Sequence, residues 1–101
     1  MVKSELLIRL KEKFPDLLPS KVDSALNCIL EQMIAALENN QRIEVRGFGS
    51  FNLRQLPPHA GRNPKTGEIL HLPEKISVHF KAGIELKDRV NEMHGKIEIT
   101  E

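Results

Sequence analysis

The spacing of apolar residues changes once along this chain, and this change limits the possible folds more than any other feature. Up to Leu37 the apolar residues recur three and four positions apart, which is the period of a helix with one buried face. From Ile43 onwards they alternate with polar residues, which is the period of a strand with one buried face. Helices and strands are therefore segregated along the chain, and we predict an α+β fold.

The first part of the chain contains two predicted helices. The first helix begins with Ser4 as its cap and is ended by Pro15, which cannot continue a helix. The second begins at Ser20 and Asp23, which resemble a capping box, and it extends to the polar stretch of residues 38–41. Its apolar stripe is wide for so small a protein, so we expect a partner chain to cover part of it.

Three later stretches alternate apolar and polar residues, namely residues 42–46, 50–54 and 75–81. Their apolar side chains would share one face of an antiparallel sheet, and their polar, partly cationic side chains would share the other. Gly47 and Gly49, between the first two stretches, allow a tight reversal because glycine tolerates positive φ. A solvated polar face is common in antiparallel sheets, so the alternation alone does not assign a function to it.

Residues 55–73 separate the second and third strands, and structureless loops of this length are uncommon in small domains. From Pro57 to Glu68 no large apolar side chain occurs, so this stretch cannot join a core. The sequence NPKTG has turn chemistry, and the residues after it alternate again. We therefore predict a projecting two-stranded arm with Pro64 at or near its tip. A disordered loop is the alternative.

The end of the chain contains a short helical stripe formed by Leu86, Val90 and Met93. This helix is predicted to begin near Gly83 and to end at Gly95. The short polar tail after it is assigned no structure. With 101 residues the chain is expected to form a single domain.

Charge is distributed unevenly, although the net charge is only +1. Residues 1–41 contain five basic and six acidic side chains, whereas residues 46–67 contain four basic side chains and no acidic one. A local basic segment in a nearly neutral protein is typical of a binding site for a polyanion such as nucleic acid. A solvated loop with incidental charge is the alternative.

The sequence contains no recognisable catalytic or metal-binding constellation. The four histidines lack metal-ligand spacing, and the glycines lack the lysine and helix of a phosphate-binding loop. Cys28 shows no sign of activation, and a lone cysteine suits a reducing cytoplasm. No stretch resembles a membrane span or a signal peptide. We therefore expect no enzymatic activity, no metal and no cofactor, and a cytoplasmic location.

The order of several motifs resembles the bacterial HU and integration host factor family. Two helices are followed by RIEVRGFGSF, then GRNPKTGE, then HFKAGIELKDRVN, and the resemblance covers about residues 2–91. The combination of GFGSF with GRNPKTG is highly specific, and RIEVRGFGSF is most similar to the beta subunit of integration host factor. The residues after Asn91 lie outside the family pattern.

The resemblance implies an intertwined dimer that binds the minor groove of DNA. The expected dimer has a helical body, a saddle-shaped sheet and two β-arms that reach around the duplex. The second subunit would be an integration host factor alpha chain, although a homodimer is possible. The dimer interface is expected to include Val22, Leu26, Ile29, Leu30, Met33, Leu37, Phe48 and Phe51.

The resemblance also implies roles for individual residues. Proteins of this family are known to insert an apolar wedge between base pairs, a role that would fall on Pro64. Glu44 would orient Arg46 towards the minor groove; a weak ion pair is the alternative. The residues expected to contact DNA are Lys3, Arg42, Glu44, Arg46, Arg54, Arg62, Asn63, Pro64, Lys65, Lys75 and Lys81.

The chain departs from the family pattern at several positions near the arm and the last helix. Leu56, His59 and Ile69 occur where basic residues are common, an alanine follows Lys81 in place of a proline, and Ile84 replaces a frequent lysine. Each change weakens phosphate contact, so we expect lower affinity or a stronger dependence on the partner subunit.

The implied function is architectural DNA binding and bending by a nucleoid-associated protein, in support of recombination and transcription control. Two alternatives remain open: an HU-like homodimer without sequence preference, and a protein-interaction module.

Overall fold

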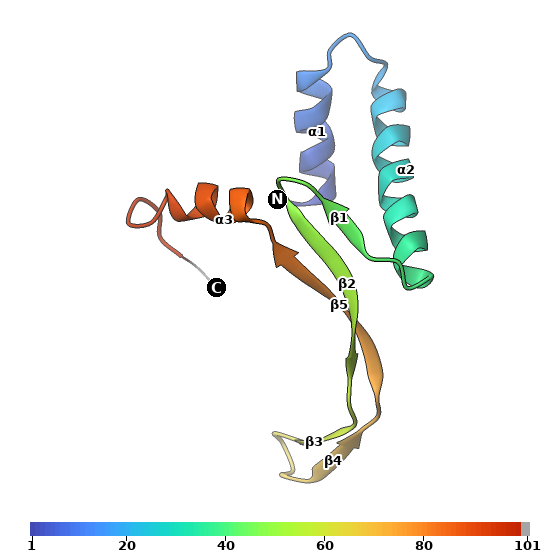
Figure 1. The fold of residues 1–101 in the computed structure, drawn as a ribbon, viewed down its shortest axis with the longest axis vertical. Coiled ribbons are helices and arrows are strands. Elements are labelled where there is room, and N and C mark those ends of the chain that lie inside the picture. The colour runs from blue at the N-terminus through green and yellow to red at the C-terminus, as the bar shows by residue number, and fades with distance from the viewer. Residues whose placement is uncertain (100–101) are drawn as a thin grey trace. The chain divides into compact units, whose positions relative to one another are not determined.

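The computed structural model describes residues 1–99 and divides into two compact units, Met1–Asn39 and the part that begins at Asn40 (Figure 1). The first unit contains the helices α1 (Lys3–Lys13) and α2 (Pro19–Glu38). The second contains five strands and the helix α3 (Ile84–Asn91). This order of elements confirms the predicted α+β class.

Both N-terminal helices begin earlier than the capping patterns predict. Val2 precedes α1 and Leu18 precedes α2, and neither residue makes a side-chain capping hydrogen bond. Ser4 and Ser20 lie inside the helices, so their predicted roles as caps are wrong. Pro19 occupies the first turn of α2, where its missing N–H costs nothing because that group would have no helical partner.

The helices end close to the predicted positions. Phe14 follows α1 and donates its backbone N–H to the Leu10 carbonyl at 3.0 Å, immediately before the proline that prevents a further turn. Asn39 follows α2 and donates its side-chain amide to the Ala35 carbonyl at 2.8 Å. Asn40 has a φ of 56°, a left-handed conformation that turns the chain out of the helix.

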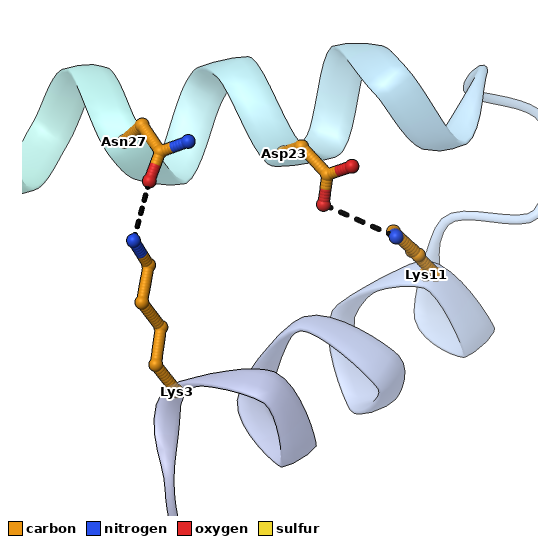
Figure 2. Close-up of polar contacts among 4 residues, drawn as sticks. All are labelled: Lys3, Lys11, Asp23 and Asn27. Atoms are coloured by element: carbon orange, nitrogen blue, oxygen red, sulfur yellow. Dashed lines mark hydrogen bonds and ion pairs between the residues drawn. The ribbon is translucent and has the colours of Figure 1, made fainter.

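The packing of α1 against α2 buries very few side chains. Val22 and Leu26, both on α2, have exposed fractions of 6% and 9%. Polar contacts also join the two helices, including an ion pair between Lys11 Nζ and Asp23 Oδ1 at 3.1 Å (Figure 2). Both side chains of this pair are substantially exposed, so its contribution to stability is about 0–1 kcal/mol.

The main sheet has three antiparallel strands in the order β1 (Ile43–Val45), β2 (Gly49–Leu56) and β5 (Lys75–Ala82). Phe51 pairs with Ile43 on one side and with Phe80 on the other, which places the predicted apolar residues on one face. The Phe51 and Phe80 rings lie 4.7 Å apart, and the Phe48 ring lies 5.3 Å from that of Phe80. The predicted segregation of the two faces is confirmed.

The predicted arm is a separate two-stranded antiparallel sheet of β3 (His59–Arg62) and β4 (Ile69–Leu72). The ladder of β2 and β5 extends as far as the pair Leu56 and Lys75. It then stops where residues 57, 58 and 73 are prolines, which have no N–H to donate to a ladder. The arm strands are therefore shorter than residues 55–73, and a break separates them from the body (Figure 1).

The helix α3 follows Gly83 but ends at Asn91, so the predicted end at Gly95 is wrong. Beyond the helix, Met93 donates its N–H to the Val90 carbonyl at 3.1 Å, and Lys96 donates to the Met93 carbonyl at 2.9 Å. These bonds span three residues and not four, so successive tight turns replace the regular helix.

Candidate nucleic-acid interface

The polar face of the main sheet carries a row of cationic and hydrogen-bonding side chains. Pairing between β2 and β5 places Ser50 opposite Lys81 and Arg54 opposite Ser77, and Glu44 of β1 pairs with Ser50 on its other edge. Because side chains alternate along a strand, the members of these pairs point to the face opposite the phenylalanine cluster. The polar residues of this face are Glu44, Ser50, Asn52, Arg54, Lys75, Ser77, His79 and Lys81, and the apolar Leu56 pairs with Lys75 at its end.

A shallow groove of about 390 Å³ lies at one end of this face. It brings together Arg42, Glu44, Arg46 and Lys81, all of which are predicted DNA contacts, and it also includes Lys87. Four cations and a single acid around one open groove form a favourable site for a polyanion.

Lys87 is the cation of this groove that the sequence interpretation missed. It lies on α3, one helical turn beyond Gly83, which also lines the groove. Residues one turn apart lie on the same side of a helix, so this spacing was the available signal. This spacing is a weak signal for Lys87, because α3 carries a second basic residue, Arg89, in its last turn.

Arg46 lies in the turn that joins β1 to β2. The Phe48 N–H donates to the Val45 carbonyl at 3.0 Å, which closes the turn around Arg46 and Gly47. Gly47 has a φ of +85°, a conformation that residues with a Cβ atom rarely adopt. The turn therefore depends on glycine at this position, and Arg46 projects from a fixed backbone rather than from a mobile loop.

The arm tip is a compact turn organised by Asn63. The Asn63 N–H donates to the Glu68 carbonyl at 2.8 Å, and its carbonyl accepts from the Gly67 N–H at 2.7 Å. Its side-chain oxygen accepts from the Lys65 N–H at 2.9 Å. Asn63 thus uses three groups to close the turn, a stabilising role that differs from the direct DNA contact that the sequence predicts.

Pro64 is the first residue of this turn and is exposed to solvent. Its neighbours Arg62 and Lys65 are also exposed, so two cations flank an apolar ring. The fixed φ of proline suits the first position of such a turn. The predicted location of the wedge at the arm tip agrees with this geometry, while its contact with DNA stays a prediction.

The arm surface also carries exposed apolar side chains. Ile69 pairs with Arg62, and 61% of its surface is exposed. Leu70 and Leu72 on the same strand are also exposed. The arm surface is therefore partly apolar where a basic arm was common in the family pattern. No neighbouring element among the described residues buries these side chains.

Lys3 belongs to the helical unit, whereas the other predicted DNA contacts lie in the second unit. Its Nζ donates to Asn27 Oδ1 at 2.6 Å, which links the start of α1 to α2 (Figure 2). This hydrogen bond leaves two of the three ammonium donors for other partners. A contact between Lys3 and DNA stays a prediction.

The residues predicted at the dimer interface differ in burial. Val22 and Leu26 are already buried in the single chain, while Ile29, Leu30 and Phe48 are exposed. Met33, Leu37 and Phe51 are partly buried. Exposed apolar side chains of this size on one helix are typical of a surface that a partner covers.

Other kinds of site find little support in residues 1–99. These residues contain no group of three or more His, Cys, Asp and Glu side chains that could hold a metal ion, and Cys28 is exposed. No helix in this range is both long enough and apolar enough to span a membrane.

Several known proteins are similar in sequence to this chain. A family model described as bacterial DNA-binding protein matches residues 1–91. The integration host factor subunit beta of Laribacter hongkongensis (strain HLHK9) is 52% identical over 91 residues, which cover 90% of this chain and 92% of that protein. The subunit of the same name from Azoarcus sp. (strain BH72) is 53% identical over 91 residues, covering 90% and 97%.

A solved structure is similar as well. The cocrystal structure of Anabaena HU with DNA has a TM-score of 0.80 and 33% sequence identity to this chain. The similarity covers 89% of this chain and 97% of the HU chain, so it includes both the helices and the strands.

Proposed function

Because this chain belongs to the bacterial DNA-binding protein family, we propose that it is an architectural protein that binds the minor groove of DNA and bends the duplex. We further propose that it acts as the beta-type subunit of an integration host factor. It would serve in the cytoplasm as part of the nucleoid, in recombination and transcription control, and without enzymatic activity. The family match spans both compact units, which supports a single DNA-binding domain.

One observation carries the proposal most directly: an exposed proline stands at the tip of a two-stranded arm and is flanked by cations. The Asn63 hydrogen bonds restrain this tip, so it presents a rigid apolar ring that has no N–H of its own. Such a ring can stack on a base where a neighbouring base has been displaced. Unstacking a base step costs a few kcal/mol, as is known for wedge-inserting architectural proteins, and wider DNA contact offsets this cost.

The sheet would supply that wider contact. Arg54, Lys75 and Lys81 lie on the polar face, where they can neutralise phosphates along the duplex. Each neutralised phosphate releases counterions, so this binding depends on salt but not on sequence. The body thus attracts DNA in general, and the arm selects sites where a kink is easy to form.

Arg46 and Glu44 would allow the protein to recognise a few bases directly. Both line the groove at the end of the polar face. A carboxylate on a DNA-facing surface opposes phosphate binding, so its presence beside Arg46 favours an orienting role. Since the minor groove mainly distinguishes A·T from G·C pairs, this reading can apply to a few base pairs only.

The partner would be a second subunit of the same fold. The exposed apolar residues of α2 and the phenylalanine cluster of the sheet are the surfaces that a second chain would bury. The relatives at 52% and 53% identity are named beta subunits, which favours an alpha-type partner. The similarity to HU keeps a homodimer as the second candidate.

Bending measured by energy transfer between dyes at the two ends of a duplex tests the proposal. The chain alone and the chain with candidate alpha subunits are compared on the same DNA. Pro64→Ala is expected to reduce the bend and weaken binding to intact duplex, yet to regain affinity on DNA nicked at the kinked step. Lys65→Ala serves as the matched variant and should weaken binding to both substrates alike. Equal bending by Pro64→Ala and the parent would rule out the wedge.

A further inference from the structure

His79 and Asn52 lie opposite each other in the middle of the main sheet. His79 is on β5 and pairs with Asn52 on β2. The neighbouring residues Phe80 and Phe51 also pair, and their rings pack 4.7 Å apart on the apolar face. Because successive side chains of a strand point to opposite faces, the imidazole and the Asn52 amide both lie on the polar face. Neither residue is among those that the sequence predicts to contact DNA.

Cationic side chains flank this pair on both sides. Lys81 lies two residues after His79 on β5, and Arg54 lies two residues after Asn52 on β2. Two residues along a strand span roughly 7 Å, and both cations are on the same face as the pair. Because the two strands are antiparallel, Lys81 and Arg54 lie in opposite directions from the pair. A phosphate backbone that contacts both cations therefore passes over His79 and Asn52.

The charged groups around the imidazole are mostly positive. Neither β2 nor β5 contains an acidic residue, and β5 carries Lys75 as a further cation of the same face. Among the described strands, β1 supplies the acid of this face, Glu44, which pairs with Ser50 and is thus one strand further away than Asn52. A phosphate at the His79 and Asn52 pair therefore meets no repulsive charge from the two strands that carry the pair.

The polar atoms of this pair are free to bind a ligand. Within residues 1–99, no hydrogen bond or ion pair engages the imidazole or the Asn52 amide. The His79 side chain is half-buried, yet no side-chain nitrogen or oxygen in this range is both buried and without a partner. The ring nitrogens are therefore open to solvent, and the Asn52 amide can donate a second hydrogen bond beside them.

We infer that His79 and Asn52 form a further phosphate-binding position on the sheet, which the backbone of DNA occupies. Neutral imidazole offers one N–H donor, whereas the protonated ring offers two donors and a positive charge. Histidine ordinarily changes its charge between about pH 5 and pH 8, so its contact with a phosphate strengthens as the pH falls through this range. The contact is with the backbone, so it strengthens binding to any duplex. This inference rests on the proposed function, because it requires DNA to lie across the polar face.

The charge is tested by His79→Asn, which stays polar but cannot be protonated. His94→Asn is the matched control, because His94 follows α3 and lines a different groove, with Val90 and Met93. The affinity of the dimer for one duplex is titrated at several salt concentrations, at about pH 5.5 and at about pH 8. In the parent and in His94→Asn, the affinity should be about threefold to tenfold higher at the lower pH, and the salt slope should be steeper by about 0.9. His79→Asn should lose most of both differences.

A permanent cation at the same position should give the converse result. His79→Lys is expected to bind at about pH 8 as tightly as the parent does at about pH 5.5, with an affinity that does not change with pH. Full retention of both pH differences by His79→Asn, in a protein that is folded by circular dichroism, would overturn the inference. Binding by the parent that does not change with pH would also overturn it and would leave the proposed function intact. A parent that neither binds nor bends any duplex would instead refute the proposed function.

Discussion

The side-chain oxygen of Asn63 accepts a hydrogen bond from the backbone N–H of Lys65 at 2.9 Å, and this contact bridges Pro64, which stands between them. The proline is thereby held between two anchored neighbours at the exposed arm tip. The proposed wedge role requires a tip that does not fold back on itself, and this hydrogen bond restrains the tip.

We expect Asn63→Ala to weaken DNA bending without removing any charge. Loss of the side-chain acceptor leaves the Lys65 N–H to water and loosens the tip, at a cost of about 1 kcal/mol or roughly fivefold in affinity for intact duplex. Thr66→Ala is the control, since the bond from the Glu68 N–H to Thr66 Oγ1 is longer, at 3.3 Å. Energy transfer on end-labelled DNA measures the bend, and equal bending by both variants would argue against a stiffening role for Asn63.

Gly47→Ala should destabilise the protein more than Gly67→Ala does. Both glycines have positive φ, +85° and +75°, but a Cβ atom at Gly47 also meets Glu85, while one at Gly67 meets nothing within 4 Å. Backbone strain costs about 1 kcal/mol at either glycine, and at Gly47 the exposed Glu85 carboxylate must also move aside, so the expected cost there is slightly higher. Thermal unfolding followed by circular dichroism gives the comparison. Equal losses of stability for both variants would show that displacing the Glu85 side chain costs no free energy.

The salt dependence of DNA binding should identify the cations of the sheet. Lys81→Ala removes a cation of the polar face, so the slope of log affinity against log salt should decrease by about 0.9. Lys11→Ala removes the same charge from the helical unit, where it is paired with Asp23, and the slope should stay the same. Titrations at several salt concentrations decide the point, and equal slopes for the two variants would contradict DNA contact by the sheet.

Ile29→Asp should prevent assembly with the second subunit. Ile29 on α2 has an exposed fraction of 57% in the single chain, and burying an unpaired carboxylate at an interface costs several kcal/mol. The dissociation constant of the dimer should rise by about a hundredfold or more. Ile8→Asp is a closely matched control, because Ile8 on α1 is equally exposed at 57% and lies outside the predicted interface. Sedimentation equilibrium measures both, and dimers of unchanged stability with Ile29→Asp would place the interface elsewhere.

The sequence determined the features that depend on neighbouring residues. The period of apolar residues predicted the helices, the strands and the shared face of Phe51 and Phe80, because periodicity reflects which side of an element is buried. Turn chemistry placed Pro64 at the arm tip. Local signals failed at the helix starts, where Ser4 and Ser20 resembled caps although backbone bonds and Pro19 start the helices without them.

Tertiary structure alone decided which distant residues meet. Lys81 and Lys87 join Arg42 and Arg46 around one groove because β5 pairs with β2 and leads directly into α3. The contact between Gly47 and Glu85 arises in the same way, from the bond of the Gly83 N–H to the Phe48 carbonyl that docks α3 beside the turn. No pattern within either segment encodes these contacts, since the pairing of β2 with β5 brings together residues that the whole arm separates in the sequence.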